Sequence, residues 1–254
     1  MIQLKTRSEI GKMRETGRMV HRIIHETARA IEPGVTTGEL EEIAVDLLCE
    51  SGGSSPCLGY APTGHPPYPA WTCISVNEEI VHSVPGRRVI KEGDIVTVDI
   101  CAELNGWLAD SAWTFPVGKV SPVAERLLKV TQEALYRGIA QARNGARTGD
   151  IGYAVQRYAE SHGFSVVREL QGHGVGRSMH EGELSIPNYG ARGRGTKLVT
   201  GMTFAIEPMI NVGRADIKNH VDGWTIVTAD NSLSAHFEHT IAITPGGAEI
   251  LTCS

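Results

Sequence analysis

Apolar residues recur at steps of three and four over residues 6–31, the spacing of an amphipathic helix with one buried face. Thr6 followed three residues later by Glu9 predicts a capping box at the start of this helix. Pro33-Gly34 predicts its end. The chain therefore opens with a long helix that must pack against the rest of the protein.

The pattern of the following residues predicts a mixture of helices and strands. Residues 53–70 are rich in glycine, proline and serine, which indicates a long ordered loop. The predicted elements are a helix from about residue 39 to 52, half-buried strands at 72–76 and 95–104, and a second long helix at 123–143.

Several short patterns occur twice in the same order. Gly-x-x-Thr-Gly-acid-aliphatic stands at 34–40 and again 111 residues later at 145–151. Residues 93–99 are similar to 201–207, and 110–114 to 238–242. Chance would explain any one of these matches, but their common order favours an internal repeat. We predict a single domain over residues 1–254, with two similar halves at about 6–120 and 121–250.

Asn105-Gly106 lies between two strand-like runs and favours a two-residue type I′ turn. That turn predicts three cross-strand pairs: Leu104 with Trp107, Cys101 with Asp110, and Asp99 with Ala112. Residues directly opposed, or two apart on one strand, share a face of the sheet. Asp99 and Asp110 are therefore expected on one side, with Cα atoms roughly 7–8 Å apart. A pair of metal ions fits that spacing.

Two further carboxylates, Glu207 and Glu238, lie in apolar runs of the second half. A buried acid must be neutralised, paired or bound to a metal, and few Lys or Arg residues are close in sequence. His173, between two glycines, is the candidate neutral ligand. An isolated carboxylate pair would be read as solvent-facing, and a lone histidine as structural. Four carboxylates with one imidazole instead favour a pair of Mn, Fe(II), Co or Zn ions.

Composition restricts the class of protein. The 254 residues are 41% hydrophobic and 21% charged, as in a folded globular domain. The net charge of −5 argues against a broad cationic face for nucleic acid or anionic lipid. Five scattered cysteines without a C-x-x-C pair argue against a disulfide framework. With no signal peptide and no run of about 18 apolar residues, we expect a cytoplasmic protein.

The combination of motifs resembles one family over nearly the whole chain, the methionine aminopeptidases of type I. The motifs are Cys73-Ile74-Ser75-Val76-Asn77-Glu78, Val81-His82-Ser83-Val84-Pro85, Gly93-Asp94-Ile95-Val96-Thr97-Val98-Asp99, Gly172-His173-Gly174-Val175-Gly176-Arg177, Phe204-Ala205-Ile206-Glu207-Pro208 and Phe237-Glu238-His239-Thr240. The resemblance implies the α+β pita-bread fold, a curved antiparallel sheet with helices on its outer face and two pseudo-symmetric halves. Type I is indicated because no domain is inserted between His180 and Glu207, and no Cys/His-rich module precedes Thr6.

The resemblance also implies an activity, which is removal of the initiator methionine from new proteins by metal-assisted hydrolysis, with preference for a small second residue. It assigns two divalent metal ions to Asp99, Asp110, His173, Glu207 and Glu238, with Asp110 and Glu238 bridging both. Glu207 would also move a proton. His180 would hydrogen-bond the scissile carbonyl oxygen, and His82 would contact the amide nitrogen or position the peptide.

By the same resemblance, the methionine side chain enters a pocket lined by Cys57, Tyr60, Tyr68, Cys73, Met179 and Trp224. Three positions depart from the family pattern. Met179 replaces a common aromatic residue, the loop between Cys57 and Cys73 is a few residues longer, and His236 could add a contact to Glu238. The implied partners are the N-terminal peptide of nascent proteins and the ribosome. We expect a monomer that binds neither membranes nor, on its own, nucleic acid.

Two other interpretations remain open from the sequence alone. An X-Pro aminopeptidase or prolidase shares the five metal ligands, although such enzymes usually carry a sizeable N-terminal domain. A binding protein that kept the fold without activity is the second interpretation, although degenerate relatives usually lose ligands and all five are present here.

Overall fold

A computed structural model describes residues 2–254, which form four helices packed on antiparallel strands. The helices are α1 (Arg7–Ala28), α2 (Thr37–Glu50), α3 (Pro122–Ile139) and α4 (Thr148–Ser161). The predicted capping box at the start of α1 is confirmed, since Thr6 and Glu9 bond each other's backbone N–H groups. Both long predicted helices are confirmed, and each ends three or four residues before the predicted limit.

Fourteen short strands complete the described chain. They are β1 (Cys73–Val76), β2 (Glu79–Val81), β3 (Ile95–Leu104), β4 (Trp107–Pro116), β5 (Ser165–Val166), β6 (Gln171–His173), β7 (Ser185–Pro187), β8 (Thr203–Ile206), β9 (Met209–Asn211), β10 (Ile217–Asn219), β11 (Ile226–Thr228), β12 (Ser234–His236), β13 (His239–Thr244) and β14 (Gly247–Ile250). All the strand pairs are antiparallel. The two sheets that border the site have the strand orders β1-β3-β4 and β14-β13-β8. The α+β class predicted from the sequence is confirmed.

The β3–β4 hairpin has the predicted register. Asn105 and Gly106 form the turn with φ angles of 53° and 77°, as a type I′ turn requires. The pairs are Leu104 with Trp107, Cys101 with Asp110, and Asp99 with Ala112. The two aspartates therefore project from the same face of the hairpin.

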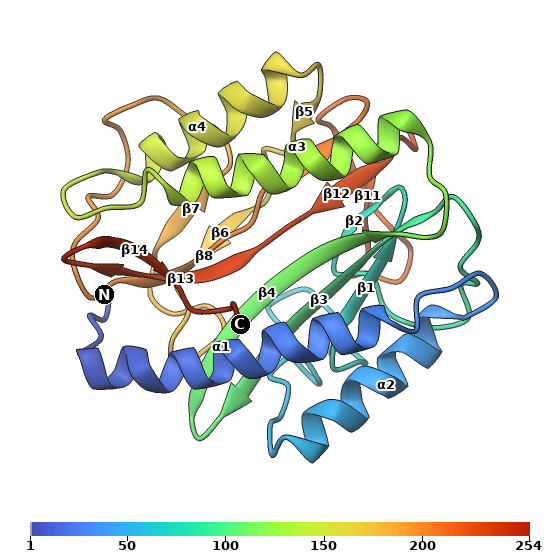
Figure 1. Cartoon of the computed structure of the whole chain (residues 1–254), viewed down its shortest axis with the longest axis horizontal. Coiled ribbons are helices and arrows are strands. Elements are labelled where there is room, and N and C mark those ends of the chain that lie inside the picture. Colours follow the sequence, from blue (N-terminus) through green and yellow to red (C-terminus); the bar gives the residue numbers. More distant parts are fainter. Residues whose placement is uncertain (1) are drawn as a thin grey trace.

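The opposite face of these strands packs against helices, which in Figure 1 cross in front of the strands. Val98 and Ile100 on β3 join a buried cluster with Val20, Ile24 and other apolar residues of α1 and α2. A separate cluster joins α3 and α4 to β8 and β13. Burial of one face of each sheet against helices fixes which residues face the other side.

Strands β4 and β13 meet at a seam between the two sheets, where serine and threonine hydroxyls and one backbone hydrogen bond make the contacts. Thr240 Oγ1 accepts from the Asp110 N–H (2.9 Å) and donates to the Asp110 carbonyl oxygen (2.8 Å). Ser111 Oγ donates to the Glu238 carbonyl oxygen (2.7 Å), and the Glu238 N–H donates to Ala112 (2.8 Å). These bonds place the two carboxylates of the seam side by side.

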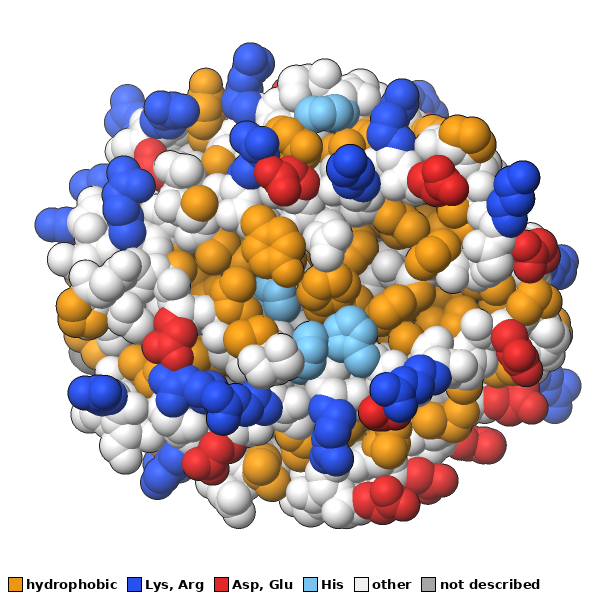
Figure 2. Space-filling view, viewed as in Figure 1, with side chains coloured by type: hydrophobic (Ala, Val, Ile, Leu, Met, Phe, Trp, Pro, Cys, Tyr) orange, Lys and Arg blue, Asp and Glu red, His pale blue; other side chains and the backbone are white. Residues whose placement is uncertain are grey.

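Figure 2 shows the helix-covered face, where charged side chains surround a hollow filled by hydrophobic and histidine side chains. A groove in the described part of the chain is lined by residues that include His25, Trp113, Phe115, Leu128 and Phe237. In the described part of the chain, no helix has the length and apolar character that crossing a membrane requires.

Helix pairs α1–α2 and α3–α4 each precede strands that carry, or directly adjoin, two of the acidic residues. Gly34 and Gly145, at the start of the repeated turn, have φ angles of 103° and 88°, in the left-handed region that only glycine enters freely. The single domain with two similar halves, at about 6–120 and 121–250, stays a prediction.

Candidate metal centre

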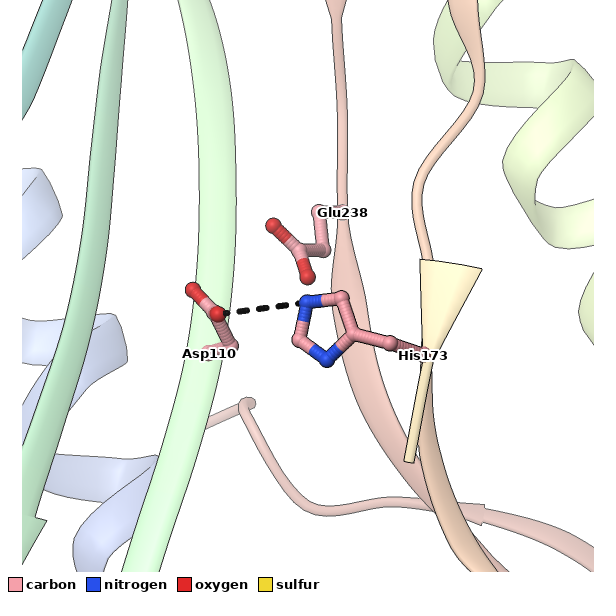
Figure 3. Close-up of side chains that lie close together, drawn as sticks. All are labelled: Asp110, His173 and Glu238. Atoms are coloured by element: carbon pink, nitrogen blue, oxygen red, sulfur yellow. Dashed lines mark ion pairs between the residues drawn. The ribbon is translucent and has the colours of Figure 1, made fainter. Parts of the chain in front are cut away.

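Two acidic side chains and one imidazole, from three separate segments of the chain, converge at the seam (Figure 3). Asp110 on β4, His173 at the end of β6 and Glu238 just before β13 each offer a ligand atom, and these atoms all lie within 4.8 Å of one another. Oδ2 of Asp110 is 3.8 Å from Nε2 of His173. In this close-up the three side chains point toward a common centre.

The other two predicted ligands border the same centre. Oε1 of Glu207, directly after β8, is 3.6 Å from Nε2 of His173. Asp99 on β3 and Asp110 line one cavity. The structure therefore brings all five predicted residues to one place, with Asp110, His173 and Glu238 the most tightly grouped.

Glycines beside His173 allow the close approach of backbones that this arrangement needs. A Cβ atom at Gly174 would overlap the carbonyl oxygen of Glu181, and one at Gly172 would overlap that of Ala205. Since any other residue would push these segments apart, His173 reaches the carboxylates only because both neighbours lack a side chain.

Burial dominates the electrostatics of the acidic residues. It raises the pKa of Asp110 from 3.8 to about 6. It also raises the pKa values of Asp99, Glu207 and Glu238 well above their ordinary range, with the charge of Asp110 adding to each. Burial lowers the pKa of His173, so its imidazole is neutral at pH 7 and does not compensate the acids.

The carboxylates lack protein partners. One oxygen each of Asp110, Glu207 and Glu238 is buried without a hydrogen bond. Within residues 2–254, the ion pairs of these three acids are with histidines and with no Lys or Arg. Buried acceptor oxygens without donors are costly, and a bound cation removes that cost. Oxygen-rich donors with one neutral imidazole suit divalent Mn, Fe, Co or Zn, so the residues present fit a metal centre.

A cavity of about 100 Å³ opens beside the centre. Its lining includes every residue predicted for the methionine pocket: Cys57, Tyr60, Tyr68, Cys73, Met179 and Trp224. Sγ of Cys57 lies 3.9 Å from Sδ of Met179, and the Tyr68 and Trp224 rings meet edge to face at 5.1 Å. Cys101 also lines the cavity and was not predicted there. The hairpin register that opposes it to Asp110 could have identified it.

His82 and His180 also lie on the cavity wall. His82 has a φ of 57°, an unusual value for a residue other than glycine, and such strain is often found at functional sites. His82 is an exposed residue, but protein atoms around its imidazole lower the pKa of that group, and the imidazoles of His180 and His173 lower it further. Burial also lowers the pKa of His180, whose ring centroid is 4.3 Å from that of His173. Both imidazoles are neutral at pH 7.

Two further contacts between charged or titratable side chains lie near the centre. Nε2 of His236 is 3.8 Å from Oε2 of Glu238, the neighbour expected from the sequence, although too long for a hydrogen bond. Lys5 forms a buried ion pair with Glu181, the residue after His180. This pair was not predicted, because nothing in the local sequence connects positions 176 residues apart.

Comparison with known proteins gives one consistent result. Residues 11–245 match the model of metallopeptidase family M24. The chain is 48% identical to methionine aminopeptidase 1 of Bacillus subtilis over 99% of both chains. It also superposes on the crystal structure of methionine aminopeptidase from Rickettsia prowazekii with a TM-score of 0.95 and 40% identity over 100% of both chains. The prolidase of Pyrococcus furiosus shares the fold alone, with a TM-score of 0.77 and 22% identity over 99% of this chain and 65% of that one.

Proposed function

The chain belongs to metallopeptidase family M24 and, within it, to the type I methionine aminopeptidases, and from this premise we propose that Asp99, Asp110, His173, Glu207 and Glu238 hold two divalent metal ions. It has the pita-bread fold of that family and removes N-terminal methionine from proteins by hydrolysis. The observation that most supports the proposed ligand set is the convergence of buried carboxylate oxygens without protein donors.

When bound, divalent ions lower the pKa of a water molecule and polarise the carbonyl group under attack. The protein's own residues complete the reaction. The Glu207 carboxylate takes a proton from the attacking water and delivers it to the leaving amine. His180 donates a hydrogen bond to the carbonyl oxygen as negative charge develops there. His82, which lines the same cavity, contacts the scissile amide nitrogen and so aligns the peptide.

The pocket chemistry supports an uncharged, sulfur-containing guest. Burial raises the pKa of the Cys57 thiol to about 12, so this wall of the pocket carries no charge at neutral pH. Burial likewise raises the pKa of Cys73. Sulfur and aromatic surfaces interact well with a thioether, whereas a lysine or glutamate side chain would lose its hydration without gaining a partner. We propose that these residues select methionine.

Metal content tests the ligand set. After dialysis against Mn, Co or Zn, the unmodified protein should retain two ions per chain. Asp110→Asn and Glu238→Gln should lose both, because each residue is proposed to bridge. His173→Ala should lose only one. Asp46→Asn, an exposed aspartate on α2, is the matched control and should retain two. Two retained ions in the bridging variants would refute the assignment.

Peptide hydrolysis tests the proposed roles. Release of methionine from Met-Ala-Ser but not from Met-Lys-Ser should show the preference for a small second residue. His82→Ala and His180→Ala should reduce turnover while metal content stays intact. Loss of metal in either variant would mean that its role is misassigned. Cleavage of X-Pro peptides alone would favour a prolidase-like activity.

The setting in the cell is also proposed from family membership. We propose a monomer that works in the cytoplasm on nascent chains at the ribosome. Co-sedimentation with ribosomes that carry a short nascent chain would test this, with empty ribosomes as the comparison. Absence of binding to both would refute ribosome association without bearing on the hydrolytic activity.

A further inference from the structure

A tyrosine of the methionine pocket touches the imidazole that contacts the substrate carbonyl. The hydroxyl oxygen of Tyr60 is 3.2 Å from Nδ1 of His180. We propose that Tyr60 is a positioning residue that holds His180 with its proton on Nε2 and with Nε2 turned toward the substrate carbonyl oxygen. The inference rests on the proposed role of His180 and adds a cause for the orientation of its ring.

Tyr60 is fixed by its own loop. Its N–H donates to the Cys57 carbonyl oxygen (2.9 Å), and its carbonyl oxygen accepts from the Tyr68 N–H (2.8 Å). The N–H of the neighbouring Gly59 donates to the Tyr68 carbonyl oxygen (2.8 Å). Trp224, whose ring lies 6.3 Å from the Tyr60 ring, donates through Nε1 to the Pro66 carbonyl oxygen. The hydroxyl therefore projects from a backbone that is held on both sides.

His180 is fixed through its backbone but not through its ring. The next residue, Glu181, donates its N–H to the Gly174 carbonyl oxygen (2.8 Å) and pairs with Lys5. Among the side chains of residues 2–254, the hydrogen bond to Tyr60 is the one that the His180 ring makes. Rotation of the ring and the choice of tautomer therefore depend on this contact.

The direction of the bond follows from the chemistry of the two groups. A phenol is a good donor and a weak acceptor, whereas an unprotonated ring nitrogen is a good acceptor, so the Tyr60 hydroxyl donates to Nδ1. A neutral imidazole carries one proton, which must then lie on Nε2. Only Nε2–H can donate to a carbonyl oxygen from this orientation. In the other tautomer, Nε2 would present a lone pair to that oxygen.

Tyr60 consequently links two tasks. Its ring is part of the wall that receives the methionine side chain, and its hydroxyl orients the group that stabilises the developing oxyanion. The long loop of residues 57–70 thereby connects recognition of the side chain to the chemical step.

A double-mutant cycle tests this linkage with Met-Ala-Ser as substrate. Tyr60→Phe keeps the ring and should lower kcat by about 2–10-fold, the effect of one hydrogen bond, with KM within about twofold. In a His180→Ala background, the same change should have no further effect on kcat, because the residue through which Tyr60 acts is gone. An equal loss of kcat in both backgrounds, or a rise in KM alone, would overturn the proposal.

Nitrogen-15 NMR of the zinc-loaded protein, with labelled histidine, provides a readout that does not depend on turnover. In the unmodified protein, Nε2 of His180 should resonate as a protonated nitrogen and Nδ1 as an acceptor. Tyr60→Phe should move both resonances toward each other. Tyr68→Phe is the matched control, since the Tyr68 hydroxyl bonds to the Thr72 and Ser83 carbonyl oxygens instead, and it should leave the His180 resonances unchanged. A proton found on Nδ1 in the unmodified protein would overturn the proposal.

The proposed role of His180 and its proposed positioning by Tyr60 can be refuted independently. If His180→Ala retains full turnover, the proposed role of His180 is wrong. If His180→Ala is impaired but Tyr60→Phe is not, the role of His180 stands and only the positioning by Tyr60 is wrong.

Discussion

Replacing Asp110 by asparagine should stabilise the protein when metal has been removed. Burial raises the pKa of Asp110 in the folded state from 3.8 to about 6, so at pH 7 ionisation of this carboxyl costs more in the folded protein than in the unfolded chain. At about 1.4 kcal/mol for each pH unit, the difference is about 3 kcal/mol. The amide is nearly the same size and carries no charge, so the variant avoids this cost.

The sign of the effect depends on pH. Above about pH 6, the raised pKa of this carboxyl destabilises the folded protein by the full amount. This cost disappears as the pH falls toward 3.8, where the carboxyl is also protonated in the unfolded chain. In chelator at pH 7, Asp110→Asn should therefore gain about 3 kcal/mol in free energy of unfolding. For a chain of this length, that gain raises Tm by about 6–12 °C. At pH 4 the two proteins should unfold alike.

Added metal should make the unmodified protein more stable than the Asp110→Asn variant. An ion that binds only the folded state stabilises it by about 4 kcal/mol at a concentration of 1,000 times Kd. The unmodified protein should gain this stability, whereas the variant lacks one of the proposed ligands. Urea unfolding in chelator and in saturating Mn would measure both effects, with Asp46→Asn as a control expected to change neither. If Asp110→Asn is less stable than the unmodified protein in chelator at pH 7, burial of the charge is not costly and the reasoning is wrong.

Three further predictions concern residues that hold the segments of the site in place. Denaturant unfolding together with metal analysis would check each of them. Gly174→Ala should lose metal and stability, because its Cβ would overlap Glu181, and retained metal would contradict this. Gly106→Ala should cost about 1 kcal/mol, because φ is 77° in the turn, but should leave metal content unchanged. Lys5→Met should cost about 3–5 kcal/mol by leaving a buried charge unpaired, and Glu181→Gln in the same chain should recover part of that loss.

The hairpin shows what can be predicted from sequence. A two-residue Asn-Gly turn permits one register, and the alternation of side chains then decides the face of every residue in β3 and β4. The placement of Asp99 and Asp110 on one side follows from those two local facts. Glu207 and Glu238 were identified as further candidate ligands because each lies in an apolar run, where a buried charge without a partner is costly.

The contacts that orient the catalytic groups could not be predicted in this way. Tyr60 meets His180 across 120 positions, and Lys5 meets Glu181 across 176. Neither pair leaves a periodic signal, since each depends on how loops approach in three dimensions. The methionine pocket is also assembled from separate loops and strands, so family resemblance rather than spacing identified its residues.

The seam between β4 and β13 has a consequence for how the protein is made. Thr240, which holds Asp110 in place, lies 130 residues after it. During translation, the two aspartates emerge long before Thr240 and the two glutamates that are proposed to bind metal with them. We therefore expect a growing chain to be inactive until these later residues have emerged and packed against the β3–β4 hairpin.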